Sequence, residues 1–279
     1  MRVFETPGNV ELQIRIPTGR VSVETTDEPR TQIDLIPRGR RGEEAIEQID
    51  ISHDEHGGRH VITVEQRDRI RWGPLQISWG GEVEVRVKCP VGSELEFSGA
   101  STELRAEGRY GKVSARTASG EIRVGDVEGK LEVKTASGDI SLDRIVSDNA
   151  SVVSVSGDLE LGHVEGRLTL RTVSGDVELD VARGPVTVST TSGNVNLKSL
   201  ETGELRVQSV SGDARIGIAR GTRIWIDATS VSGDMNSELT VADGTPADES
   251  EASGEVVPVH VKTVSGDVRI IRAGAPVGG

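Results

Sequence analysis

The sequence predicts an all-β fold, a parallel β-solenoid (β-helix) with rungs of about 18 residues, and three observations support this. A Ser-Gly pair followed by an acidic or amide residue recurs at Ser119, Ser137, Ser156, Ser174, Ser192, Ser211, Ser232 and Ser265. Ser101 opens the same pattern with Thr102 in the glycine position, and the steps from it are 18, 18, 19, 18, 18, 19, 21 and 33 residues. Within each repeat, apolar and polar residues alternate, as in strands with one buried face. Aromatic residues are only 2% of the 279 residues, so the core must be aliphatic.

Residues 1–98 are expected to form strands and hairpins that make the first irregular rungs or a cap. Leu12, Ile14 and Ile16 alternate with polar residues, and Pro17-Thr18-Gly19 predicts a turn. The next segment, 20–26, resembles residues 167–173 position for position, so we expect the repeat to start near the N-terminus and then to be interrupted.

Residues 38–80 interrupt the repeat. Residues 43–49 predict one or two helical turns, and residues 49–64 predict a hairpin that turns around His53-Asp54-Glu55-His56-Gly57-Gly58. Trp72 and Trp79 flank Gly73-Pro74 in a second expected hairpin.

Residues 99–272 are expected to form the regular solenoid. Counted from the Ser of each Ser-Gly pair, four positions are almost always apolar: six and four before it, and three and five after it. In the repeat at Ser174 these residues are Leu168, Leu170, Val177 and Leu179. Their recurrence predicts two short strands per rung, with like residues stacked about 4.8 Å apart. Parallel crossovers are right-handed in most proteins, so we expect a right-handed coil.

Two polar columns accompany the apolar ones. The position two before the reference Ser always carries a hydroxyl, at Thr117, Thr135, Ser154, Thr172, Thr190, Ser209, Ser230 and Thr263. We expect a structural ladder in which each hydroxyl donates to its neighbour in the stack or to a corner carbonyl, with Thr172 and Thr190 bonded along the stack. No His or acid stands in the column to activate a nucleophile. The acidic column Asp139, Asp158, Asp176, Asp213, Asp234 and Asp267 is expected to accept hydrogen bonds from turn amides without a metal.

The C-terminal part ends the repeat. Residues 242–257 are small and acidic and predict a flexible loop, and residues 273–279 predict a disordered tail. The segment Val268–Arg272 is expected to be the last edge strand, guarded by Arg269 and Arg272. We therefore expect a monomer or small oligomer, with end-to-end association as a possibility.

Charge and composition exclude several classes of function. The net charge of −13 argues against binding nucleic acid through its phosphates. Cys89 is the only cysteine, and no run of about 18 apolar residues occurs. From these features, and from the lack of a signal peptide at Met1, we expect a cytoplasmic protein without direct membrane insertion.

No catalytic, cofactor-binding or metal-binding residue is predicted. His53, His56 and His60 have a spacing that zinc accepts, but a solvated polar turn is the commoner case. Trp72, Trp79 and Trp225 could stack on sugars, but isolated aromatic residues in β proteins more often cover the edge of a core. Acidic residues are spread over the whole chain without one constellation, and no phosphate-binding Gly-rich loop leads from a strand into a helix.

The Ser-Gly-Asp-Val repeats, the start Phe4-Glu5-Thr6-Pro7 and the turns Pro17-Thr18-Gly19 and Pro90-Val91-Gly92-Ser93 carry a family resemblance. The chain resembles a widespread bacterial β-strand-repeat family that is catalogued as a domain of unknown function and labelled "putative adhesin". The resemblance implies a β-solenoid without an established enzymatic activity.

The function we expect is a non-enzymatic scaffold or interaction surface with an unknown protein or polysaccharide partner. Two alternatives stay open at this point: a filament-forming cytoskeletal scaffold similar to bactofilins, and a carbohydrate-binding or carbohydrate-cleaving β-helix.

Overall fold

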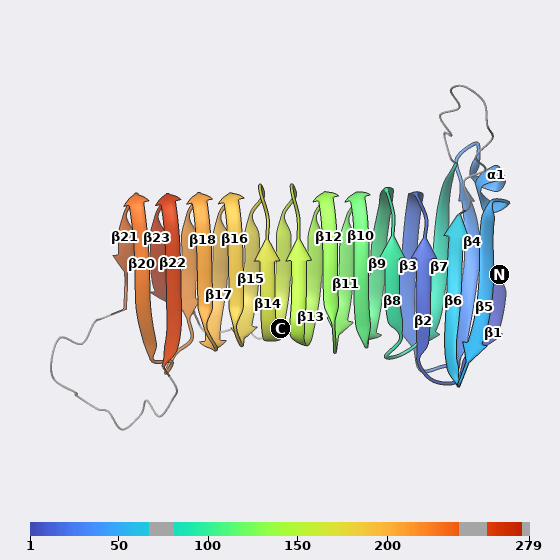
Figure 1. The fold of residues 1–279 in the computed structure, drawn as a ribbon, viewed down its shortest axis with the longest axis horizontal. Coiled ribbons are helices and arrows are strands. Elements are labelled where there is room, and N and C mark those ends of the chain that lie inside the picture. Colours follow the sequence, from blue (N-terminus) through green and yellow to red (C-terminus); the bar gives the residue numbers. More distant parts are fainter. Residues whose placement is uncertain (67–80, 240–255, 275–279) are drawn as a thin grey trace. The chain divides into compact units, whose positions relative to one another are not determined.

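The computed structural model describes residues 1–66, 81–239 and 256–274, and these residues form an all-β chain with one short helix (Figure 1). The chain divides into two compact units, Met1–Leu142 (unit 1) and Asp143–Gly279 (unit 2). The boundary falls inside strand β13 (Ile140–Val153). In both units a Ser-Gly corner joins two strands, which we call the pre-corner and the post-corner strand of one layer.

Unit 1 contains two columns of parallel strands. The pre-corner strands pair in the order β6 (Arg59–Gln66), β2 (Val10–Arg15), β8 (Glu94–Ser98), β10 (Lys112–Ser119) and β12 (Leu131–Ser137). The post-corner strands pair in the order β7 (Glu82–Pro90), β3 (Thr18–Thr26), β9 (Ser101–Tyr110) and β11 (Ile122–Val127). The first layer of the chain, β2 with β3, therefore lies between two layers that follow it in sequence.

Antiparallel strands close one end of unit 1. Strand β5 (Ile49–His56) pairs with β6, β4 (Arg30–Arg38) pairs with β7, and β1 (Arg2–Glu5) pairs with β4. The hairpin predicted for residues 49–64 is thus confirmed, and α1 (Gly42–Ile46) confirms a helical turn. The hairpin expected around Trp72 and Trp79 lies outside the described residues.

The repeat starts near the N-terminus, as expected, but the resemblance of residues 20–26 to residues 167–173 does not reflect the same position in a layer. Residues 20–26 were matched to the pre-corner segment 167–173, but Val21 pairs with Leu104, which pairs in turn with Ile122. Val21 and Val23 therefore occupy post-corner positions, and the pre-corner positions belong to Leu12 and Ile14. The corner between them is Thr18-Gly19, which is in register with Ser101 and Thr102.

Unit 2 also contains two columns of parallel strands, one of pre-corner and one of post-corner strands. The pre-corner part of β14 (Leu159–Arg171) is followed in space by β16 (Val186–Ser192), β18 (Leu205–Ser211), β22 (Val257–Ser265) and β20 (Ile224–Ser232). The post-corner part of β14 is followed by β15 (Val177–Arg183), β17 (Val195–Thr202), β19 (Ala214–Ile218), β23 (Val268–Arg272) and β21 (Met235–Ser237).

This order corrects the expectation that Val268–Arg272 is the last edge strand. The last layer in sequence, β22 with β23, lies between the β18–β19 layer and the β20–β21 layer (Figure 1). Val259, for example, is in register with Leu205 on one side and with Ile226 on the other. The outer layer of unit 2 is therefore β20–β21, and Arg269 and Arg272 do not guard it.

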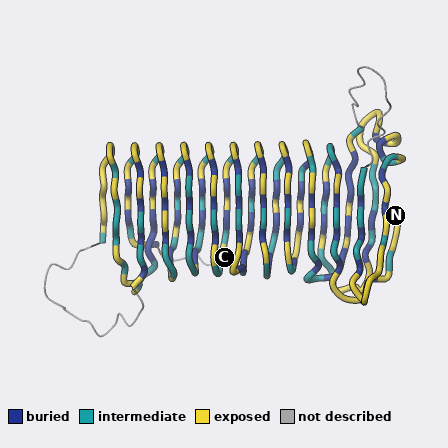
Figure 2. Tube along the Cα trace, in the orientation of Figure 1, coloured by how far each residue is buried: buried dark blue, intermediate teal, exposed yellow. Residues whose placement is uncertain are grey.

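The core consists of the predicted apolar columns. Leu168, Leu170, Val177 and Leu179 are at most 3% exposed, and buried and exposed positions alternate along the strands (Figure 2). The exceptions lie in the β20–β21 layer, where Met235 is 55% exposed, because among the described residues this layer has a neighbouring layer on one side only.

Candidate functional site

The Ser-Gly corners bring successive layers into backbone contact. Gly175 has a φ of +121°, and a Cβ on this residue would lie 2.1 Å from the carbonyl oxygen of Gly157 in the preceding layer. Glycine is the residue that tolerates both this φ and this approach. The corners therefore stack without side chains between them, which gives unit 2 a flat and regular edge.

The acidic column ties the corners together. The Asp176 N–H donates to Asp158 Oδ1 at 2.8 Å, and the Asn194 N–H donates to Asp176 Oδ1 at 2.7 Å. The same bond continues through Asp213, Asp267 and Asp234 with distances of 2.8 to 2.9 Å. The prediction that backbone amides satisfy this column is confirmed, and the amides come from the next layer.

The hydroxyl column makes the second of the two expected bonds, the one to a corner carbonyl. Thr172 is 6% exposed and donates from Oγ1 to the Ser174 carbonyl at 3.1 Å, two residues along its own chain segment. Thr117, Thr135, Ser154 and Ser209 make the equivalent bond at 3.1 to 3.2 Å. Thr190 Oγ1 is buried and has no hydrogen-bond partner among the described residues. The expectation that Thr172 and Thr190 bond along the stack was therefore wrong, although the structural role of Thr172 is clear.

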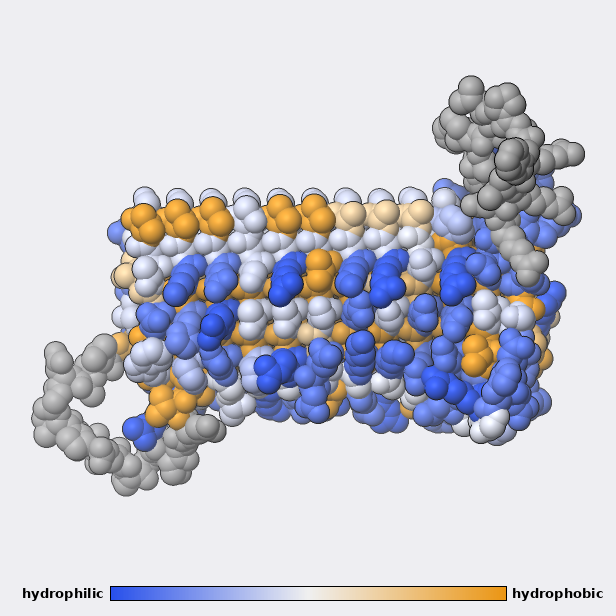
Figure 3. Space-filling view, in the orientation of Figure 1, coloured by the Kyte–Doolittle hydropathy of each residue, from blue (hydrophilic) through white to orange (hydrophobic). Residues whose placement is uncertain are grey.

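Beside the corner serines of unit 2 runs a row of exposed aliphatic side chains. They immediately precede the serines, and we call them the valine row: Val155, Val173, Val210, Val264 and Val231. Their exposed fractions are 50% to 78%. The pairing of the serines places them in the order 155, 173, 210, 264 and 231, with Thr191 between the second and third. Figure 3 shows hydrophobic residues in a line along this edge of unit 2.

The valine row was missed from the sequence, although its signal was present. Every repeat has a small or β-branched residue at this position, and in unit 1 it is alanine, at Ala118 and Ala136. These residues point outward and do not contribute to the core, so the apolar periodicity that predicts buried positions does not identify them.

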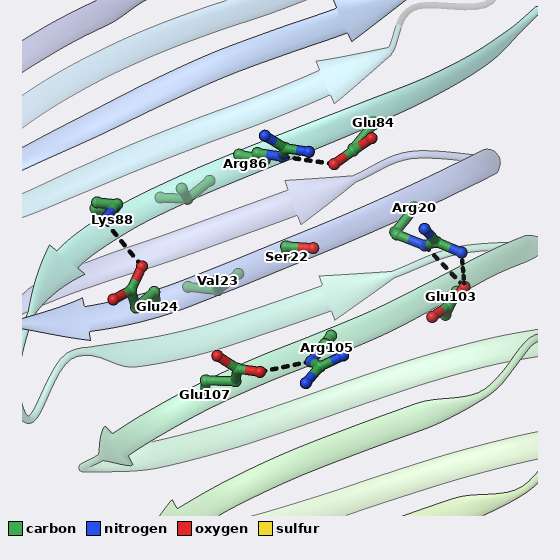
Figure 4. A pocket seen from close by; sticks show the side chains of 11 residues that line it. Arg20, Ser22, Val23, Glu24, Glu84, Arg86, Lys88, Glu103, Arg105 and Glu107 are labelled. Carbon is green, nitrogen blue, oxygen red and sulfur yellow. Dashed lines mark hydrogen bonds and ion pairs between the residues drawn. The ribbon is translucent and has the colours of Figure 1, made fainter. Parts of the chain in front are cut away.

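A charged groove of about 420 Å³ lies on the outer face of β7, β3 and β9 in unit 1 (Figure 4). Arg20 contacts Glu103 at 2.8 Å, Lys88 contacts Glu24 at 3.0 Å, and Arg105 contacts Glu107 at 2.5 Å. Ser22 stands in register with both Arg86 and Arg105. Every carboxylate of the groove has a cationic partner.

Glu84 is the buried member of this groove. Its side chain is 4% exposed, and it is bound by Arg38 and by Arg86, the latter at 2.5 Å. The Arg38 guanidinium holds the pKa of Glu84 below its usual range, burial opposes this effect, and Arg86 adds to the lowering. A carboxylate held ionised in this way is suited to fixing β4 against β7 and unsuited to proton transfer near neutral pH.

The histidines of β5 and β6 do not converge with acids. His53 Nε2 and His60 Nδ1 are 3.1 Å apart, and the His53 ring lies 5.2 Å from the Phe4 ring. His56 lies next to the turn of the hairpin, opposite Arg59. No group of three or more metal-ligating side chains occurs among residues 1–66, 81–239 and 256–274.

Of the three tryptophans, the described residues include Trp225 alone. Its side chain is 54% exposed, and its ring meets the His260 ring edge-on at 5.2 Å. His260 also lies 3.4 Å from Asp227. A single indole on an edge strand does not form the flat platform of several rings that a sugar-binding surface uses.

Comparison with known proteins identifies the family of the chain and does not identify an activity. A family model described as Toastrack DUF4097 matches residues 10–271. No curated protein is significantly similar to the chain. No helix among the described residues has the length and apolar character needed to cross a membrane.

Several solved structures are similar over almost their whole length. They include a putative cell adhesion protein from Clostridium sporogenes (11% identity, 97% of this chain and 98% of that one, TM-score 0.24). They also include a putative adhesin from Bacteroides fragilis (12% identity, 96% of this chain and 95% of that one, TM-score 0.36). A third is a putative lipid binding protein from Parabacteroides distasonis (11% identity, 96% of this chain and 95% of that one, TM-score 0.31). Identities and TM-scores this low transfer no function.

Proposed function

The chain belongs to the Toastrack family, and from this premise we propose that it is a non-enzymatic scaffold that presents the valine row of unit 2 to a protein partner. One observation carries the proposal: Val155, Val173, Val210, Val264 and Val231 are half or more exposed on an edge whose backbone is fixed layer by layer. Exposed apolar groups that form a continuous strip mark interaction surfaces more often than isolated ones do.

The proposal includes the finer architecture. We propose a right-handed β-solenoid with rungs of about 18 residues, in keeping with the register of Leu168 with Val186 and of Val186 with Leu205. Residues 1–98 act as its irregular first rungs or cap, and residues 99–272 as its regular part.

The chemistry of the row favours a protein partner over a polysaccharide. The row contains aliphatic side chains and Thr191, and serines lie beside it, so it offers apolar contact and few hydrogen bonds. Sugars are bound mainly through aromatic rings and directed hydrogen bonds. A protein surface with its own aliphatic strip fits better, because both surfaces then bury apolar area that would otherwise be exposed to solvent.

The paired charges of unit 1 support a role without catalysis. Glu24, Glu84, Glu103 and Glu107 each contact a lysine or arginine in the charged groove. A general acid or base needs a pKa near the working pH, and Arg38 moves the pKa of Glu84, the buried carboxylate of the groove, away from that range.

The test is affinity capture from the native cell with two matched variants. The first carries Val173→Ser and Val210→Ser, which remove the apolar surface from the middle of the row. The second carries Arg171→Ser and Gln208→Ser, which alter exposed residues two positions earlier on the same segments. We expect a partner that binds the wild type and the second variant and is lost from the first. Equal binding to both variants would place the interaction surface elsewhere.

A further inference from the structure

In the described part of the chain, the outer strand of unit 2, β20, has one edge that pairs with no other strand. β20 pairs in parallel with β22 along its whole length from Ile224 to Ser232, and β22 is its only strand partner among the described residues. A strand in this position presents a row of free backbone N–H and C=O groups that accept a further strand.

The direction of these free groups follows from one hydrogen bond. The Val257 N–H donates to the Arg223 carbonyl at 2.9 Å, so the backbone groups of Arg223 face β22. In an extended strand the N–H and C=O of one residue point to the same side, and the side alternates from residue to residue. The groups of Trp225, Asp227 and Thr229 therefore also face β22. The groups of Ile224, Ile226, Ala228 and Ser230 face the open edge.

The side chains of β20 do not guard this edge. Its nine residues include one charged residue, Asp227, which contacts His260 at 3.4 Å, and they include no lysine or proline. Trp225 is 54% exposed and Val231 is 78% exposed. Natural proteins usually protect an edge of this length with charges, prolines or bulges.

The outer strands of unit 1 are guarded in that way. β1 has only four residues, and two of them are Arg2 and Glu5. β5 carries Asp50, Asp54 and Glu55. The described part of the chain therefore has one long outer strand with little charge, and it is β20.

We propose that two copies of the protein associate through their β20 strands, which form an antiparallel ladder around a twofold axis at Ala228. This register uses all nine residues and places Ala228 opposite Ala228 of the second copy. The two Ala228 residues then form a hydrogen-bonded pair, because their N–H and C=O groups face the open edge.

The same register pairs the exposed apolar side chains. Trp225 lies opposite Val231 of the second copy, and this occurs twice because of the twofold axis. These are non-hydrogen-bonded positions, where side chains come closest, and aromatic with β-branched pairs stabilise sheets there. Asp227 lies opposite Thr229 of the second copy, so the two carboxylates do not face each other.

This contact closes on itself. A twofold contact uses the same surface on both copies, so it produces a dimer and leaves no β20 edge for a third copy. The proposal therefore differs from a filament, in which one end of the molecule binds the opposite end of the next.

The first test measures mass in solution over a wide concentration range, by sedimentation or light scattering. We expect a monomer–dimer equilibrium that does not grow further. Ala228→Pro removes an N–H on the open side and none of the bonds to β22, so it should give a monomer with an unchanged fold by circular dichroism. Val231→Lys should also give a monomer, whereas the control Val173→Lys, in the middle of the valine row, should still dimerise. A wild type that is monomeric throughout, or that grows without limit, would overturn the proposal, and so would a dimer that survives Ala228→Pro.

The second test fixes the register by disulfide formation. Positions 225 and 231 of two copies would be close enough for a disulfide, whereas within one strand they are six residues, or about 20 Å, apart. The double variant Trp225→Cys with Val231→Cys should give a covalent dimer on mild oxidation, and each single variant should not. The natural Cys89 does not interfere, because burial raises its pKa to about 12. Equal cross-linking of the single and double variants would exclude this register.

Discussion

The Asp176 carboxylate accepts a hydrogen bond from the backbone N–H of Asn194, with 2.7 Å between Oδ1 and N. Asn194 repeats the arrangement with its own Oδ1, which accepts from the Asp213 N–H at 2.9 Å. A neutral amide oxygen therefore fills the same place in the column as a carboxylate. The position requires a side chain whose oxygen reaches the N–H of the next layer, and this matters more than a negative charge.

We predict from this that Asp176→Asn is tolerated and Asp176→Ala is not. Asparagine keeps the acceptor and lowers the repulsion along the column, so the free energy of unfolding should change by less than about 0.5 kcal/mol. Alanine leaves the Asn194 N–H without its partner, and the loss should be about 1 kcal/mol. Urea denaturation of the two variants measures the difference, and equal losses would show that charge is what matters.

The same geometry predicts that calcium does not stabilise the column. The amides of the next layer already bind Asp158, Asp176, Asp213 and Asp267, so a cation would have to displace them. The melting temperature should stay the same with added calcium and with a chelator. A rise with calcium that disappears in Asp176→Asn would contradict this prediction.

The hydroxyl column offers a pair of positions matched in burial. Thr172 and Thr190 are both 6% exposed, but Thr172 donates to the Ser174 carbonyl while Thr190 Oγ1 has no partner among the described residues. Thr172→Val should cost about 1 kcal/mol of unfolding free energy, because the carbonyl loses its donor. Thr190→Val should be neutral or stabilising, because it removes an unsatisfied hydroxyl. Equal effects in thermal denaturation would mean that Thr190 finds a partner in solution.

The apolar columns could be predicted from the sequence because two periods coincide. Leu170 is buried by the alternation within its strand, and it is in register with Val188 because the repeat has a constant length. Alternation alone could not place Val21 and Val23, since a pre-corner and a post-corner strand have the same period of two. Only the pairing of Val21 with Leu104 distinguishes the two.

The order of the last two layers could not be predicted for a related reason. Ile226 and Val259 stand at the same position of the repeat, so either of them fits beside Leu205. The chain places Val259 there. The valine row, in contrast, stands at a fixed position of the repeat, so the predicted stacking of like residues was enough to place it along one edge.

Glu132 gives the protein a predictable response to acid. Lys134 at 2.7 Å and then Arg116 at 3.0 Å lower the pKa of Glu132 from 4.5 to about 2. A carboxyl with a lowered folded-state pKa stabilises the fold above the unfolded pKa, and this contribution is lost as the pH falls toward the folded value. Glu132→Gln should therefore lower stability by about 1 kcal/mol at pH 7, since the side chain is largely covered and contacts three cations, Lys134, Arg116 and, at 3.8 Å, Lys130. The difference from the wild type should shrink between pH 4.5 and pH 2. A difference that is constant with pH would contradict the assignment.

Removing the C-terminal layer distinguishes the observed order from the sequential one. β22 lies between β18 and β20, so deletion of residues 256–279 takes away the only strand that pairs with β20 among the described residues. Trp225, Asp227 and Thr229 would then lose the hydrogen bonds of their backbone groups, and β20 should lose its order. Hydrogen exchange should show fast exchange for residues 224–232 in the deletion variant and slow exchange at those three amides in the full chain.

The amide of Val186, deeper in unit 2, serves as the control and should stay protected, because it donates to the Glu204 carbonyl at 2.8 Å and the deletion leaves β16 and β18 paired. If the layers followed the sequence, the deletion would remove an outer layer and leave β20 paired with β18. Protection that persists at Trp225, Asp227 and Thr229 in the deletion variant would therefore contradict the observed order. It would also undermine the proposed dimer, because β20 would no longer be the outer strand of the full chain.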